Sequence, residues 1–337
     1  MEIKFTTLHH VDHLGNEIRI IPISSHSEVL QIYAERLIQE IKDSRNKREF
    51  EFRSETTEVR QTLNSFLEDI FEEGVEVNSK RLLTEEKKAQ RKIDHLDVQI
   101  QKGSLFQAHL IDGSEHYIVI SKADHSKYID EIDFVLKHGL PWDKKIFKAF
   151  LVRFDDNKEV QEVYVYDTTS KMSRYWWDDF LELNEKYTDS HNTKTSLDIL
   201  DQKLFNYMKK QYPADHTILR NSVIGYFRNS SEFELEEFLD KNFRTYTPID
   251  EDFPKEKYIK KIEEFPEKYN FDSRFSIKQE EIKKRKVNKI PLSNEMELIL
   301  KDHIENIGSV IKPYKDNEGN KFILIRSDTG YERFKDQ

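Results

Sequence analysis

The sequence predicts an α+β fold: an N-terminal antiparallel sheet with flanking helices, a small helical middle section and a C-terminal β-rich module. Strand-like segments occur in runs instead of alternating one by one with helices, and polar turn sequences separate them. The 22 Phe and 15 Tyr residues offset a charged fraction of 35%, because each ring buries a large apolar area. We therefore expect three folded parts, residues 1–190, 191–270 and 271–337.

The first hundred residues predict two strands and three helices. Residues 3–23 begin with alternating polar and apolar side chains and contain a turn sequence at 14–17. Apolar residues at helical spacing follow over residues 27–41 and again over residues 55–71. A third helix, rich in charge, is expected over residues 79–92.

The centre of the sequence predicts two β-hairpins of one sheet. Residues 105–122 hold an Asp-Gly turn between two apolar runs, and residues 147–167 hold the polar turn 155–158. Residues 132–136, between the hairpins, have a helix-like pattern. One of the two adjacent tryptophans that follow the second hairpin is expected to lie in the core.

The polar segment 184–194 marks the first boundary, and helical patterns follow it. Helices are expected over residues 196–208, 215–228 and 231–243. Three prolines interrupt residues 245–270, which are expected to form a connector with one broken helix.

The last section returns to strand patterns. Strands are expected at 275–278 and 286–292, and a helix or turn at 295–304. A closing hairpin is expected from the strands 310–313 and 321–326, which a polar, Gly-containing turn separates.

Composition excludes several classes of function. The chain has no cysteine, so disulfides, thiolate zinc sites and cysteine nucleophiles are excluded, and a reducing compartment is favoured. No phosphate-cradling G-x-x-x-x-G-K or G-x-G-x-x-G pattern and no G-x-S-x-G pattern occurs. The N-terminus lacks the apolar core of a signal peptide, and no run is long enough to span a membrane. We therefore expect a cytoplasmic protein without membrane contact, cofactor or metal.

Two basic stretches stand out in a chain whose net charge is −10. Residues 273–289 hold seven basic and two acidic residues, and residues 80–92 hold six basic and two acidic ones. Such clusters neutralise phosphates, although a charge run is more often a solvated face. Tyr269, Phe271 and Phe275 lie beside the first stretch, where they would stack on bases. The candidate nucleic-acid-binding residues are Arg274, Lys278, Lys283, Lys284, Arg285, Lys286 and Lys289, and then Lys87, Lys88, Arg91 and Lys92.

Three parts of the layout belong together. They are the segment Leu8-His9-His10-Val11-Asp12 with the strand at 18–23, the meander at 105–122, 148–152 and 177–182, and the C-terminal module with Ile277, the strand at 287–291 and the hairpin strand at 321–325. This layout resembles the bacterial nucleoid-associated protein family over most of the chain. The resemblance implies a cytoplasmic, DNA-associated protein of the nucleoid that forms a homodimer, with no catalytic residues to carry over. The basic residues 80–92 and the proline-rich connector depart from the family layout.

The sequence thus predicts a non-enzymatic nucleoid-associated-like protein that binds duplex DNA mainly through phosphates and without sequence preference. One alternative is a protein-interaction component, such as a part of a phage-defence (antiviral) system, that acts through a partner protein. Another is a metal-dependent nuclease with carboxylates and a lysine on adjacent strands. Its candidate residues are Asp112, Glu115, Lys122, Asp155, Asp156 and Asp167.

A metal site near the N-terminus is disfavoured on geometric grounds. His9, His10, Asp12 and His13 have the right ligand chemistry for zinc or manganese. On a strand, however, His9 and His10 point to opposite faces, and His9 and His13 lie roughly 13 Å apart.

Overall fold

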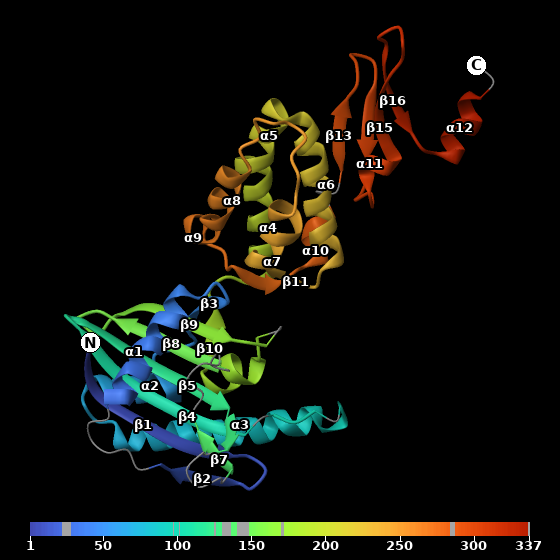
Figure 1. The fold of residues 1–337 in the computed structure, drawn as a ribbon. Coiled ribbons are helices and arrows are strands. Elements are labelled where there is room, and N and C mark those ends of the chain that lie inside the picture. The colour runs from blue at the N-terminus through green and yellow to red at the C-terminus, as the bar shows by residue number, and fades with distance from the viewer. Residues whose placement is uncertain are drawn as a thin grey trace. The chain divides into compact units, whose positions relative to one another are not determined.

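The computed structural model describes residues 1–21, 28–96, 98–100, 102–124, 126–129, 136–139, 148–169, 172–283 and 287–335 (Figure 1). These residues form two compact units. The first comprises Met1–Thr188 together with Asp272–Arg274, and the second comprises Asp189–Phe271 and Phe275–Gln337.

The first unit is built on an eight-stranded antiparallel sheet with the strand order β10-β3-β9-β8-β5-β4-β1-β2. The sheet contains both expected hairpins, β4–β5 and β8–β9. The two strands β6 (Ser126–Ile129) and β7 (Leu136–Gly139) pair separately. The strands of the large sheet are β1 (Glu2–Asp12), β2 (Glu17–Ile20), β3 (Lys47–Phe52), β4 (Gly103–Asp112), β5 (Glu115–Asp124), β8 (Lys148–Phe154), β9 (Val160–Asp167) and β10 (Leu183–Glu185).

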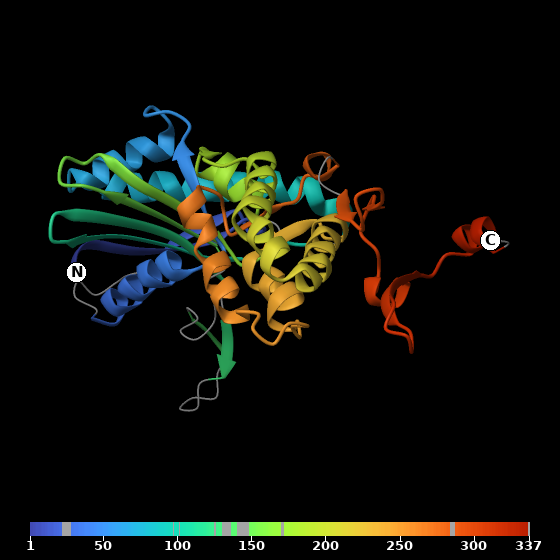
Figure 2. The same cartoon turned by 90° about the horizontal axis from the view of Figure 1, so that it is seen from above.

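Helices cover both faces of this sheet, as Figure 2 shows. Helix α1 (Glu28–Asp43) packs on the face that carries Phe106. Helices α2 (Glu58–Leu67) and α3 (Glu72–Ile93) pack on the other face, which carries Ile118. Because strand side chains alternate between faces, both faces of the central strands are apolar and both are buried.

The adjacent tryptophans lie in the π-helical turn η2 (Tyr175–Phe180). Trp176 is fully buried in the core, which confirms the expectation for one of the pair. Trp177 is partly buried, with its ring centroid 5.3 Å from that of Phe50. The short 3-10 helix η1 (Asp94–Leu96) follows α3.

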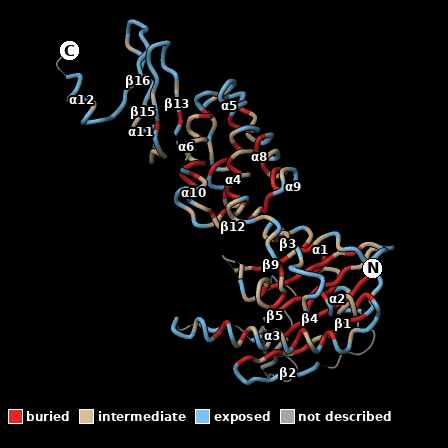
Figure 3. The backbone as a smooth tube through the Cα atoms, turned by 180° about the vertical axis from the view of Figure 1, so that it is seen from behind, coloured by how far each residue is buried: buried red, intermediate tan, exposed pale blue. Residues whose placement is uncertain are grey.

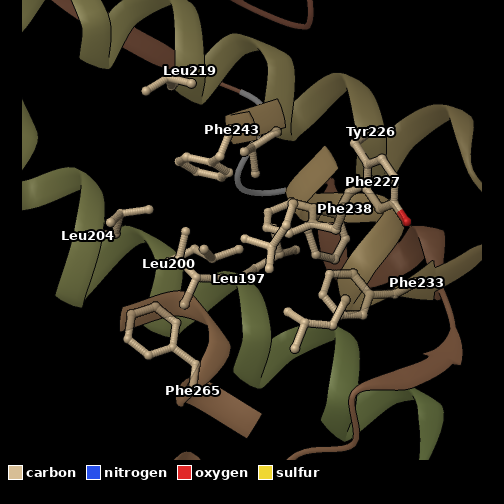
Figure 4. Packing of buried hydrophobic residues seen from close by; sticks show 14 of the residues in the cluster. Leu197, Leu200, Leu204, Leu219, Tyr226, Phe227, Phe233, Phe238, Phe243 and Phe265 are labelled. Atoms are coloured by element: carbon tan, nitrogen blue, oxygen red, sulfur yellow. The ribbon is translucent and has the colours of Figure 1, made fainter. Parts of the chain in front are cut away.

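The second unit begins with a bundle of short helices, as the sequence predicts for its middle section. Figure 4 shows how Phe227, Phe233 and Phe238 pack among leucines of neighbouring helices. The helices are α4 (Asp189–Ile199), η3 (Leu200–Phe205), α5 (Asn206–Gln211), α6 (Pro213–Asn229), α7 (Leu235–Leu239), η4 (Asp240–Arg244), α8 (Lys255–Glu263), α9 (Phe265–Tyr269) and α10 (Gln279–Ile282).

The C-terminal part is β-rich, as expected, and its strands form pairs instead of one sheet. Strand β12 (Arg274–Ser276) pairs with β11 (Glu232–Glu234) of the helical section, β13 (Asn288–Pro291) with β14 (Glu297–Leu300), and β15 (Ile311–Lys315) with β16 (Lys321–Ile325). Two short helices, α11 (Ile307–Val310) and α12 (Asp328–Phe334), flank the last pair. No helix among the described residues is long and apolar enough to cross a membrane.

Several expected elements differ in the structure. A helix or turn was expected over residues 295–304, but Glu297–Leu300 is strand β14. The Ser293 hydroxyl accepts a hydrogen bond from the backbone amide of Glu295, and Leu292 N donates to Met296 O. These bonds close a hairpin instead of capping a helix. The helix-like pattern at 132–136 is wrong at Leu136, which begins β7, while residues 132–135 lie outside the described residues.

Candidate nucleic-acid interface

Helix α3 has one buried face and one basic face. Its buried residues recur every three or four positions, which is the spacing of a single helix face. They include Val75, Ser79, Leu82, Glu86 and Gln90. The basic residues of the second half of α3 lie between these positions and therefore point away from the sheet.

We call Lys87, Lys88, Arg91 and Lys92 the basic end of α3. Lys88, Arg91 and Lys92 are exposed, and Lys87 is half-buried. The Arg91 side chain makes no hydrogen bond or ion pair with any residue that the structure describes. The last turn of a helix carries the negative end of its dipole, which stabilises cations there.

The contacts of the three lysines at this end are few and peripheral. Lys87 donates to Asn16 Oδ1 at 2.8 Å, and Lys88 lies 2.7 Å from Glu85. Lys92 lies 3.8 Å from Asp179. Exposed pairs of this kind contribute roughly 0–1 kcal/mol, so they exchange readily for a phosphate.

The other basic residues of this stretch have different surroundings. Lys80 is exposed beside Glu76, whereas Arg81 donates to the carbonyl oxygens of Asp179 and Phe180 and serves the fold. Of the two acidic residues in the stretch, Glu86 is fully buried and is absent from the surface. One acidic and one basic residue of the stretch are thus taken up by the fold, and its exposed side keeps an excess of about four positive charges.

The basic stretch at residues 273–289 is only partly described. Lys284, Arg285 and Lys286 lie outside the described residues. Lys283 is exposed at the end of α10, and Lys289 is exposed on β13, 3.9 Å from Glu297.

Lys278 and Arg274, at the start of this stretch, lie in different settings. The Lys278 ammonium is 3.4 Å from Asp189 within the second unit. Arg274 belongs to the first unit and is only 9% exposed. Its guanidinium donates to the carbonyl oxygens of Asp167 and Thr169. Because the guanidinium is buried and bonded to these carbonyl oxygens, Arg274 has a structural position in the first unit.

Two of the three aromatic residues beside this stretch, Phe271 and Phe275, belong to the core, and the expectation that these two stack on bases is wrong. Phe275 is 1% exposed, and its ring stacks on Phe233 with the centroids 4.7 Å apart. Phe271 is buried in the same cluster, and Tyr269 packs against it. The faces of these buried rings are covered by other apolar side chains and are not accessible to a base.

The candidate nuclease residues are divided between opposite ends of the central strands. Asp112, Glu115, Asp155 and Asp156 lie at the β4–β5 and β8–β9 turns, where Glu115 pairs with Arg153 and Asp155 accepts turn amides. Lys122 and Asp167 are buried near the other end. Among the described residues, no three His, Asp or Glu side chains gather in a way that would hold a metal ion.

A buried trio of ionisable side chains, which the sequence pattern does not predict, lies on the α3 face of the sheet. Lys122 forms an ion pair with Glu86, and the His13 Nδ1 atom lies 3.5 Å from Glu86 Oε2. All three side chains are almost wholly buried. On the neighbouring strand Lys148, the register partner of Lys122, donates to Asp167 at 2.8 Å. Helical spacing places Glu86 on the buried face of α3, and this was the available signal.

Comparison with known proteins places these features in a family context. The family model described as nucleoid-associated protein YejK matches residues 8–325, which is nearly the whole chain. No curated protein matches the sequence.

Proposed function

The chain belongs to the nucleoid-associated protein YejK family, and from this premise we propose that it is a non-enzymatic protein that binds duplex DNA through phosphate contacts. The observation that carries the proposal is the basic end of α3. There, Lys88, Arg91 and Lys92 are exposed on a helix whose opposite face is fixed against the sheet. A rigid helix that presents several cations together provides a preformed phosphate-binding surface.

The charge balance of the chain makes this binding local and sensitive to salt. With a net charge of −10, most of the surface repels DNA, so the affinity must come from a basic patch. Each phosphate that is neutralised releases condensed counterions. The logarithm of the affinity then falls with the logarithm of the salt concentration by about 0.9 per contact.

A second contact surface is proposed in the second unit. It comprises Lys278, Lys283 and Lys289, and it also includes Lys284, Arg285 and Lys286, which the structure leaves undescribed. Arg274 is left out of the proposal because its guanidinium is engaged by carbonyl oxygens.

The proposed contacts are independent of DNA sequence. Lysine and arginine side chains on a helix flank reach phosphate oxygens, which are the same at every base pair. Phe271 and Phe275, which lie beside or within residues 273–289, do not support base stacking, because they are buried. We therefore propose about equal affinity for unrelated duplexes.

Charge reversal tests each surface separately. The variants are Lys88→Glu with Arg91→Glu on α3, and Lys284→Glu with Arg285→Glu on the second surface. Each pair is expected to weaken binding on every duplex and to reduce the salt slope by about 2, because each phosphate contact contributes about 1 to the slope. The measurement is fluorescence anisotropy with two unrelated duplexes over a series of salt concentrations.

A matched control changes the same charge elsewhere. Lys209 and Lys210 are adjacent exposed lysines on α5, and reversing both alters the net charge by the same amount. This control is expected to retain most of the affinity and the wild-type slope. If both patch variants behave like the control, neither surface contacts DNA and the proposal is wrong.

We propose that the protein acts in the cytoplasm, on the nucleoid, as a homodimer.

The purified protein also separates this proposed function from the two alternative functions. A component of phage defence that acts through a partner protein would show little salt-dependent DNA affinity and would co-purify with a second protein. A metal-dependent nuclease would cut the duplex during long incubation with Mg²⁺ or Mn²⁺, and a chelator would stop the cutting.

A further inference from the structure

The closing hairpin β15–β16 forms a small sheet of its own within the second unit. Both faces of β16 are apolar and exposed: Phe322 is 46%, Ile323 48%, Leu324 52% and Ile325 47% exposed. Figure 3 shows this hairpin in the colour of exposed residues. An isolated two-stranded sheet is at best marginally stable in water, so this one is expected to pack against something further.

The two edges of the hairpin differ in their free backbone groups. Arg326 N donates to Val310 O at 2.8 Å, and Asp316 N donates to Asn320 O at 3.1 Å. Hydrogen-bonded and non-hydrogen-bonded pairs alternate in an antiparallel ladder. Val310 with Arg326 and Asp316 with Asn320 are hydrogen-bonded pairs. The pair of Pro313 and Ile323 lies midway between them and is therefore a non-hydrogen-bonded pair.

The outer edge of β15 is interrupted and that of β16 is open. At a non-hydrogen-bonded position the backbone nitrogen points away from the partner strand, and Pro313 has no N–H to offer there. On β16 the N–H and C=O groups of Lys321, Ile323 and Ile325 point outward for the same reason. No strand in the described part of the chain pairs with this edge.

We propose that β16 pairs with β16 of a second copy of this chain, antiparallel, about a two-fold axis at Ile323. In this register Ile323 faces its own counterpart and Lys321 faces Ile325 of the second copy. The three outward-pointing residues of each strand are then all used. The inference deepens the homodimer proposed above and does not depend on DNA binding.

Two features favour a second copy of the chain as the partner. They are the positions of the lysine side chains and the blocked margins of the resulting sheet. The antiparallel register keeps the two Lys321 side chains at opposite ends, whereas a parallel one would set these like charges face to face. The resulting four-stranded sheet has β15 at both margins, each interrupted by Pro313. Proline at an edge prevents further strand addition, so assembly stops at the dimer.

Pairing also brings apolar residues of the two copies together on both faces of the sheet. One face collects Pro313, Ile323 and Ile325 from each copy, with Lys315 and Lys321 beside them, and the other collects Tyr314, Phe322 and Leu324, with Lys312 beside them. The interface is isologous, as expected for a two-fold dimer.

A proline at Ile323 tests the open edge. Because the Ile323 N–H points out of the hairpin, Ile323→Pro removes the central donor of the proposed interface and leaves the β15–β16 bonds in place. Lys315→Pro is the matched control, since it puts proline at a non-hydrogen-bonded position on the interrupted edge. Sedimentation velocity of the full chain at several concentrations, without DNA, is the measurement.

Wild type and Lys315→Pro are expected to dimerise, and Ile323→Pro is expected to be monomeric or to dissociate at least tenfold more readily. A monomeric wild type, or an Ile323→Pro dimer of wild-type affinity, would overturn the inference. A failure of DNA binding with an intact dimer would instead count against the proposed function alone.

A cysteine cross-link tests the register even where the proline variant misfolds. The chain has no cysteine, so Ile323→Cys introduces a single thiol. Across a hydrogen-bonded antiparallel pair the Cα atoms lie about 5.5 Å apart, so a short bis-maleimide cross-linker can bridge the two thiols. Treatment with this cross-linker is expected to yield a covalent dimer on a denaturing gel, and Lys315→Cys is expected to yield none. Equal cross-linking of the two variants, or none at position 323, would refute the pairing.

Discussion

Glu86 is a carboxylate with no solvent exposure, on a helix whose other side is covered with charge. Its partners are Lys122 from β5 and His13. Two opposite charges can be buried together because their mutual attraction offsets the desolvation cost of both, whereas one left alone would remain uncompensated. The trio therefore fixes the depth and rotation of α3 against the sheet, and with them the direction in which the basic end of α3 points.

Glu86→Ala is expected to lower the free energy of unfolding by about 3–5 kcal/mol, because Lys122 loses its buried counter-charge. Urea denaturation measures the change. Glu85→Ala is the control: among the described residues Glu85 pairs only with the exposed Lys88, and its loss should cost at most about 1 kcal/mol. Equal costs for the two glutamates would show that the buried pair is unimportant.

At the scale of elements, helix α6 holds the segment that follows β14. The Asn221 side chain donates to Ile304 O at 2.8 Å and accepts from Ile304 N at 2.9 Å. Arg228 pairs with Asp302 at 2.5 Å. Between these two contacts Gly225 leaves room for the ring of His303, because a Cβ atom there would lie 2.5 Å from the ring.

Gly225→Ala is therefore expected to displace His303 from α6, although alanine is the better helix former by roughly 1 kcal/mol. Hydrogen exchange in residues 297–304 should accelerate at least several-fold. In Gly308→Ala the new methyl group meets open space, so exchange there should stay at the wild-type rate. Unchanged exchange in Gly225→Ala would mean that the segment accommodates the methyl group.

Elements with a strong local pattern were predictable, and those fixed by distant partners were not. The buried stripe of α3 and the turns of the two central hairpins are visible in the sequence. Strand β3 was missed because its six residues lie between two strong helical patterns, although Phe50 and Phe52 alternate with glutamates. Its place between β9 and β10 is set by residues more than a hundred positions away.

At the scale of the whole molecule, each unit contains a buried histidine that resists protonation. Burial lowers the pKa of His109 in the first unit and of His216 in the second to about 4 in each case. The unfolded chain takes up these protons near pH 6.5. Stability from these groups is thus complete above about pH 6.5 and is lost as the pH falls towards 4.

The variant His216→Leu should remove its share of this acid sensitivity. Between pH 6.5 and 4 the slope of the unfolding free energy against pH is expected to shrink by up to about 1.4 kcal/mol per pH unit, because one proton no longer binds the unfolded chain preferentially. Urea denaturation across this range gives the slope. Above pH 7 the difference between variant and wild type should be constant, and a slope as steep as wild type at low pH would contradict the assignment.

The residues of the candidate nucleic-acid interface are only partly predictable from the sequence. Sequence locates lysines and arginines, but burial decides which of them face solvent. Lys88 and Arg91 follow from helical spacing, because the buried positions Leu82, Glu86 and Gln90 define the opposite face of α3. Arg274 looks equivalent in the sequence, yet carbonyl oxygens of residues 167 and 169 hold it inside the first unit.

The tripeptide Asp272–Arg274 determines when during translation the first unit can be completed. Asp272 accepts hydrogen bonds from the Arg48 side chain and the Glu49 amide, both at 3.1 Å, within the first unit. The main body of that unit ends at Thr188, 84 residues earlier (272 − 188). At 5–20 residues per second the ribosome needs roughly 4 to 17 seconds to cover this gap. The N-terminal unit is thus completed only after translation of the helical section that follows it.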